Sequence, residues 1–143
     1  MNSLYRLLVA AHAVAAVLGL GLITAVAIAA SVAGRSRPAV NETLAWLRPL
    51  LRYSAFSLAA MLVTGVLLDV AVSGAWSRTW WFRGSVLLLI ATGALHGRTR
   101  AIVCKDLSTG SGTEAALLRV SRMAFGMCGL IAVITVLMEV KPF

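Results

Sequence analysis

Four long apolar runs constrain the fold of this chain more than any other feature. They cover Leu7–Val32, Tyr53–Val72, Trp80–His96 and Met123–Val140, and 60% of the 143 residues are hydrophobic. A run of about 18 or more apolar residues crosses a bilayer as a helix, since each helical residue adds about 1.5 Å. The third run is the shortest, and its aromatic start suits the headgroup level of a membrane. The sequence therefore predicts an integral membrane protein with four spans.

The connections between the runs indicate how the four helices pack. The connection Ser73–Thr79 is short, so the second and third helices are expected to be antiparallel neighbours. Most glycines lie within the runs, where small residues let helices approach closely. The sequence contains no internal repeat, no soluble domain and no phosphate-binding glycine loop. We therefore expect an all-α fold, a single four-span domain over residues 1–143 arranged as an antiparallel four-helix bundle.

Two of the connections carry signals for helix starts. Asn41 is placed to cap a short helix lying in the membrane interface, and Pro49 suits the first turn of the second span. In the last connection, Thr113 or Ser111 is placed to cap a helix that begins near Glu114. This helix is expected to run without a break into the fourth span.

The net charge of +8 is distributed between the spans and is not concentrated on a soluble domain, which argues against nucleic acid as a partner. Positive residues favour the cytoplasmic side of a membrane. The side that carries both termini holds Arg6, Arg78, Arg83 and Lys141, and the other side holds Arg35, Arg37, Arg48, Arg52, Arg98, Arg100, Lys105, Arg119 and Arg122. The bias predicts both termini outside, two longer connections in the cytoplasm, and anionic lipids as partners of the cytoplasmic face.

His12 is the main candidate functional residue. It is the only ionisable side chain in Leu7–Val32, and it lies about five residues, or roughly 8 Å, past the outer end of that span. An ionisable group in lipid is costly and usually faces a protein interior, a cavity or a cofactor. Neutral imidazole is also the commonest metal ligand. We therefore expect His12 to bind a cofactor or metal, the alternative being a hydrogen bond to a neighbouring helix.

Each of the other helices brings a charged residue to the same leaflet. Asp69 lies near the outer end of the second span, Arg83 near the outer start of the third, and Glu139 near the outer end of the fourth. These residues are predicted to meet His12 in one outer cavity, or else to lie separately at the interface in contact with water. His96 ends the third run on the opposite side, so it is not expected to share a metal with His12.

A stripe of small residues shares the helical face of His12. Ala15, Ala16 and Gly19 follow it at three, four and seven positions. Such a groove admits a flat ligand and a tightly packed helix equally well, and the sequence does not decide between them.

Sulfur-containing residues in the fourth span allow a copper interpretation. Thioether and thiolate ligands favour Cu(I), and the span contains Met123, Met127, Cys128 and Met138. Methionine is also a common core residue of membrane helices. Copper is therefore the alternative cofactor.

The layout of the chain resembles the bacterial membrane protoporphyrinogen IX oxidases of the HemJ type. The resemblance rests on His12, on Arg52-Tyr53 before the second span, on the Trp-rich start of the third span with His96 near its end, and on the terminal Val140-Lys141-Pro142-Phe143. It implies a b-type haem bound through His12, a porphyrin ligand and a place in the bacterial inner membrane. The layout is also similar to the copper-resistance D membrane family, which is associated with copper uptake.

Two departures from the oxidase pattern bear on the expected reaction. Arg83 stands where that family has a lysine, and an Asn-Glu-Pro segment at the start of the last span is missing. An arginine does not readily lose its proton, so it is suited to pairing with a haem propionate and not to acting as a base.

Three functions from different classes follow from these observations. The leading one is a b-type haem-binding membrane protein, with His12 as the metal ligand and Asp69, Arg83 and Glu139 around the cofactor; as an enzyme it would oxidise a porphyrinogen. The second is a copper-handling membrane protein. The third is a non-catalytic bundle that forms a homo-oligomer or joins a larger membrane complex.

Overall fold

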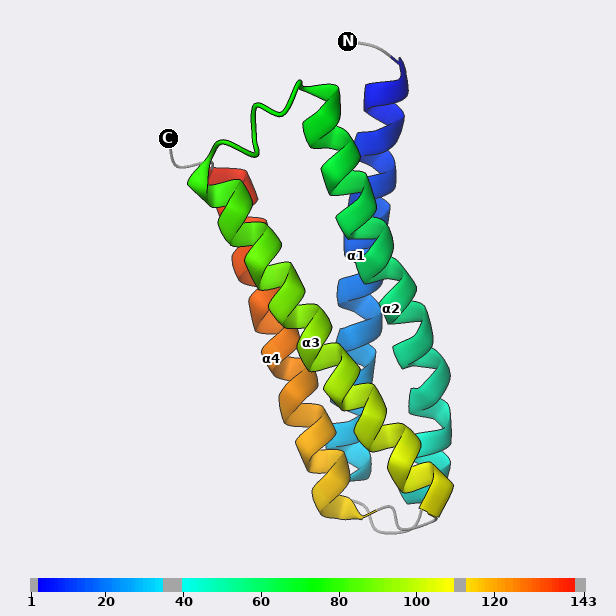
Figure 1. The fold of residues 1–143 in the computed structure, drawn as a ribbon. Helices are drawn as coiled ribbons and strands as arrows, with labels where there is room; N and C mark the ends of the chain where they lie inside the picture. The colour runs from blue at the N-terminus through cyan, green and yellow to red at the C-terminus, as the bar shows by residue number, and fades with distance from the viewer. Residues whose placement is uncertain (1–2, 35–39, 110–112, 141–143) are drawn as a thin grey trace.

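The computed structural model describes residues 3–34, 40–109 and 113–140, which form four helices (Figure 1). These helices are α1 (Ser3–Ala33), α2 (Val40–Ala71), α3 (Trp80–Thr109) and α4 (Glu114–Val140), and the described residues contain no strand. All four are long and apolar enough to cross a membrane. This result confirms the predicted all-α four-helix bundle and its membrane character.

The helices are antiparallel, and each packs against two neighbours. α1 packs against α2 and α4, and α3 packs against the other sides of the same two helices. The N-terminal end of α1, the C-terminal end of α4 and the connection between α2 and α3 lie at one end of the bundle (Figure 1). We call this the turn end. The opposite end, where α2 and α4 begin, is called the basic end after its arginines.

Apolar side chains also cover the outside of the bundle, as expected for helices that face lipid. A soluble protein would bury most of these groups, whereas here they are exposed on all four helices. The most exposed of them include Leu7, Val17, Val32, Val70, Leu87, Val136 and Val140.

The well-packed core lies toward the basic end. It contains fully buried side chains from every helix: Ile23, Val26, Leu44, Leu47, Leu51, Val103, Leu117, Val120 and Met127. The hydroxyl of Ser121 adds a link from α4 to α1 by donating to the carbonyl of Ala27 at 3.0 Å. Toward the turn end the buried cluster is much smaller, consisting of Ala15, Met61 and Ile134. Cavities are therefore expected at the turn end, where His12 lies.

Two helices are longer than the sequence predicts. The separate interfacial helix expected from Asn41 is instead the beginning of α2, which runs through Pro49 to Ala71. α3 continues past His96 to Thr109, because the segment after His96 contains no helix-breaking proline. α4 begins at Glu114 as predicted, and the Thr113 hydroxyl accepts the Ala116 N–H at 3.2 Å. Ser111 lies outside the described residues.

A tight turn ends α2 and reverses the chain. Ser73 and Gly74 both take positive φ values, 59° and 71°, and the N–H of Gly74 donates to the Asp69 carbonyl at 2.9 Å. Positive φ is costly for a residue with a Cβ, so Ser73 is held there by the surrounding hydrogen bonds. This turn sets the positions of the aromatic residues that lie just before α3 and in its first turn.

Candidate functional site

The His12 ring lies between α1 and α2 and is oriented by one hydrogen bond. Its Nδ1 lies 2.8 Å from the hydroxyl oxygen of Thr64. That hydroxyl has a single proton, and it donates this proton to the backbone of α2, with the Ala60 carbonyl at 2.7 Å. With that proton on the Ala60 carbonyl, the Thr64 oxygen is placed to accept from Nδ1–H of His12. Neutral His12 therefore carries its proton on Nδ1 and a free lone pair on Nε2.

Gly65 leaves free space beside the His12 ring. A Cβ built on Gly65 would lie 3.4 Å from Cε1 and 3.8 Å from Nδ1 of His12. A larger side chain at this position would overlap the imidazole. A Cβ itself would make only ordinary van der Waals contact, so Gly65 matters for the free space beside the imidazole and not for the position of the ring.

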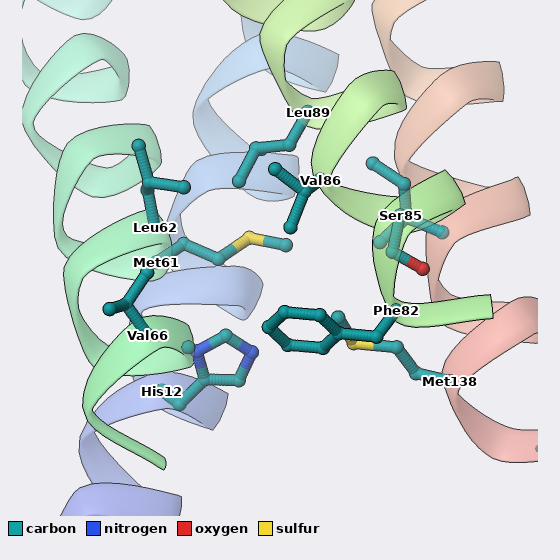
Figure 2. A pocket seen from close by; sticks show the side chains of 11 residues that line it. His12, Met61, Leu62, Val66, Phe82, Ser85, Val86, Leu89 and Met138 are labelled. Atoms are coloured by element: carbon teal, nitrogen blue, oxygen red, sulfur yellow. The ribbon is translucent and has the colours of Figure 1, made fainter. Parts of the chain in front are cut away.

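His12 faces a cavity of about 440 Å³ at the turn end. Ligand pockets in proteins typically measure about 300–1,000 Å³, so the space is large enough for an organic cofactor. Aromatic and small side chains make up much of its wall, which includes Tyr5, Ala13, Ala16, Trp76, Trp81 and Phe82. A smaller cavity adjoins it deeper in the bundle and shares His12, Met61, Phe82 and Met138 with it (Figure 2).

Two thioethers line the same space as His12. Met61 comes from α2 and is 5% exposed, and Met138 comes from the last turns of α4. Figure 2 shows Met61 on the imidazole side of the cavity and Met138 beside the Phe82 ring. Thioether sulfur is a soft ligand for metals and a known partner of histidine at haem iron.

Ser85 supplies a polar group that has no partner. Its hydroxyl is buried beside the smaller cavity, the residue is 1% exposed, and it alone among the buried side-chain polar atoms of the described residues lacks a hydrogen bond. A buried hydroxyl without a partner costs about 1–3 kcal/mol. A ligand or water oxygen in the cavity would satisfy it.

Of the predicted companions of His12, Glu139 reaches the cavity and the other two hold the neighbouring turn. Glu139 is part of the cavity wall. Asp69 accepts two backbone N–H groups with Oδ1, from Trp76 at 2.9 Å and Ser77 at 3.0 Å. Arg83 donates from Nε to the Ser77 carbonyl at 2.8 Å and is exposed. Neither Asp69 nor Arg83 lines the cavity.

Asp69 and Arg83 nevertheless shape the site through the turn. They fix the backbone next to Trp76, whose ring packs against Trp81 with centroids 6.2 Å apart. Trp81 in turn packs edge-on against Phe82 at 6.0 Å. All three aromatic rings line the cavity, so the turn sets the position of its aromatic wall.

His96 belongs to a separate environment. It is buried in the middle of α3, and its Nε2 lies 2.8 Å from the Ser54 hydroxyl, which donates to the Leu51 carbonyl at 3.1 Å. Ser54 and Thr64 are ten residues apart on α2, which corresponds to roughly 15 Å along the helix axis. The two histidines are therefore too far apart to hold one metal ion, as the sequence predicts.

Replacing Ser54 with alanine tests the structural role of His96. The change leaves the buried Nε2 of His96 without its hydrogen-bond partner, so we expect a loss of about 1–3 kcal/mol in the free energy of unfolding. Thermal unfolding in detergent measures it. Ser57→Ala is the matched control, because the Ser57 hydroxyl bonds only to its own helix at the Tyr53 carbonyl. Equal effects of the two changes would contradict this role.

The remaining sequence candidates serve packing. Ala15 and Gly19 are buried, and a Cβ at Gly19 would lie 3.5 Å from the Cβ of Ser57, so this part of the stripe packs against α2. Met127 is fully buried in the core, and Cys128 lies 3.4 Å from the Thr24 hydroxyl. No group of three or more His, Cys, Asp or Glu side chains suited to a metal occurs in the described residues.

The fold and this cavity together define a small all-α membrane bundle with His12 open to a cavity at the turn end. The chain matches no family model, no curated protein and no solved structure. Its function must therefore be argued from the geometry around His12.

Proposed function

We propose that the chain is a b-type haem-binding membrane protein and that Nε2 of His12 is an axial ligand of the iron. The observation that carries the proposal is the position of His12, whose Nδ1 is held by Thr64 while its ring lines the cavity. Thr64 accepts the Nδ1 proton, which leaves the Nε2 lone pair available beside a cavity of about 440 Å³. Metal-binding histidines generally donate their other ring N–H in this way.

The cavity wall fits a flat, mostly apolar cofactor. Ala13, Ala16 and Gly65 leave room beside the imidazole, and the Trp and Phe rings provide apolar surface. Met138 also lines this cavity and is available as a second ligand, whereas the unpaired Ser85 hydroxyl lies at the smaller adjoining cavity. Haem bound here would supply one-electron redox chemistry, and a porphyrinogen is a substrate class that such chemistry can oxidise when an electron acceptor takes up the electrons.

The charges at the turn end bear on the haem propionates. Among the described residues, no arginine or lysine lines the cavity, but one acidic residue, Glu139, does. Two arginines directly follow lining residues in the sequence, Arg6 after Tyr5 and Arg83 after Phe82, and both are exposed. We propose that the propionates point out of the turn end toward these arginines and not into the bundle.

A second candidate function is copper binding, which the two thioethers favour. His12, Met61 and Met138 all line the smaller cavity, and together they provide one imidazole and two thioethers (Figure 2). This set suits Cu(I). A single ion would leave most of the larger cavity unused, and for this reason haem remains our first proposal.

The charge distribution supports a proposal for the orientation in the membrane. Arg48, Arg52, Arg98, Arg100, Lys105, Arg119 and Arg122 all lie toward the basic end. Because positive residues favour the cytoplasm, we propose that this end faces the cytoplasm of a bacterial inner membrane. The His12 cavity then opens toward the outer side.

Titration of the detergent-purified protein with ferric haem tests the proposed function. We expect a shifted Soret band that saturates at one haem per chain, and parallel metal analysis after Cu(I) loading should find no stoichiometric copper. Copper bound at one ion per chain, without a Soret shift on addition of haem, would overturn the haem proposal in favour of copper binding. Binding of neither would overturn both proposals.

A further inference from the structure

A second pocket lies at the basic end, on the surface between α2 and α3. It measures about 490 Å³ and is lined by three arginines, Arg48 and Arg52 on α2 and Arg100 on α3, together with Pro49, Tyr53 and Phe56. Arg48 and Arg52 are four residues apart and so share a helical face. None of the three arginines pairs with a carboxylate in the part of the chain that the structure describes. Their positive charge is therefore free to bind an anion.

The same seam between α2 and α3 continues as an apolar groove deeper in the bundle. A cavity of about 290 Å³ lies there, with almost entirely apolar walls: Ala55, Leu58, Ala59 and Leu62 on α2, and Leu89, Ile90 and Gly93 on α3, with His96 at one end. Arg100 is one helical turn from His96, and Phe56 is adjacent in sequence to Ala55. A basic pocket thus leads directly into an apolar groove.

We propose that this seam binds one anionic phospholipid, with its phosphate on Arg48, Arg52 and Arg100 and an acyl chain in the groove between α2 and α3. Arginine suits phosphate because its guanidinium group donates paired hydrogen bonds. Basic pockets between transmembrane helices on the cytoplasmic side bind lipid head groups in this way. A free phosphate ion would use the arginines but would leave the apolar groove without an occupant.

The first test compares two triple variants with the same change in net charge. Arg48, Arg52 and Arg100 are changed to glutamine in one, and Arg98, Arg119 and Arg122 in the other, which lie toward the same end but outside the cavity. The full chain is equilibrated in mixed micelles of phosphatidylglycerol and phosphatidylcholine, and bound lipid is counted by native mass spectrometry.

We expect wild type to retain one phosphatidylglycerol per chain in preference to phosphatidylcholine. The cavity variant should lose affinity roughly 100-fold, given the usual contribution of each basic residue near a membrane surface, while the control stays within about twofold. Equal losses in the two variants would overturn the site, as would equal retention of the two lipids.

A second variant tests the groove without touching any charge. A Cβ at Gly93 meets no atom within 4 Å, so Gly93→Leu fits the fold and projects its side chain into the groove. We expect it to weaken retention of phosphatidylglycerol at least tenfold. Gly84→Leu is the matched control, since it lies about half a turn around α3 and also meets no atom.

Competition with inorganic phosphate separates a lipid from a free anion. Excess phosphate at constant ionic strength should leave the bound phosphatidylglycerol in place. Displacement by phosphate, or no effect of Gly93→Leu, would show an anion site without an acyl-chain groove and would overturn the lipid proposal. Neither outcome depends on haem binding at His12, because the two sites are at opposite ends of the bundle.

Discussion

Replacing His12 with alanine is expected to abolish haem binding, with at least a roughly 100-fold loss of affinity and loss of the Soret shift. Changing an outer-shell partner of a metal ligand typically costs about 10–100-fold, and removal of the ligand itself should cost more. His12 offers the Nε2 lone pair to the cavity, and Thr64 fixes that tautomer. Haem titration followed by absorption spectroscopy measures the affinity.

Two further variants serve as controls for the His12→Ala result. Thr64→Val keeps the shape of the side chain but removes the acceptor of the Nδ1 proton, so affinity should fall by about 10–100-fold. His96→Ala removes a histidine whose Nε2 is engaged by Ser54, and it should leave the Soret band in place. A Soret band that survives His12→Ala but not His96→Ala would reverse the assignment.

Replacing Asp69 with alanine is expected to lower the free energy of unfolding by about 1.5–3 kcal/mol, although Asp69 does not line the cavity. Its Oδ1 accepts the N–H groups of Trp76 and Ser77, and hydrogen bonds to a charged acceptor are among the stronger ones. Without this carboxylate the turn loses its anchor. Chemical or thermal unfolding in detergent measures the change.

Asp69→Asn distinguishes the turn anchor from a role of the charge in the site. Asparagine retains an oxygen that can accept both N–H groups, so it should restore most of the lost stability. The tryptophan fluorescence should follow the same order, since Trp76 and Trp81 pack on each other beside the turn. If asparagine is as damaging as alanine, the negative charge matters more than the hydrogen bonds that we describe.

The fold was largely predictable because a membrane imposes a simple length rule. Four apolar runs gave four helices, and Glu114 was correctly expected to begin the last of them. The ends of the helices were less predictable. α3 extends past His96 because helical hydrogen bonding continues into polar sequence where no proline stands, whereas α2 begins at Val40 and continues through Pro49, which the sequence placed in the first turn of a shorter helix.

The site was only partly predictable. The depth of each residue along its helix correctly separated His12 from His96 and placed Glu139 at the level of the His12 cavity. Depth alone does not predict which way a side chain points around the helix axis. Asp69 and Arg83 lie at a similar level and bond to the turn instead. The sequence alone does not single out Thr64, Gly65 and Ser85, because isolated small or weakly polar residues are common in membrane helices. The adjacent Thr64-Gly65 pair, polar and small on one helix, was the available signal.

The most direct test of the central claim is pulsed electron paramagnetic resonance of the haem-loaded protein with ¹⁵N-labelled histidine. It reports whether an imidazole nitrogen is bound to the ferric iron. We predict a strong coupling to one histidine nitrogen in the wild type, unchanged in His96→Ala and absent in His12→Ala. The same histidine coupling in His12→Ala, or none in the wild type, would contradict His12 as the ligand.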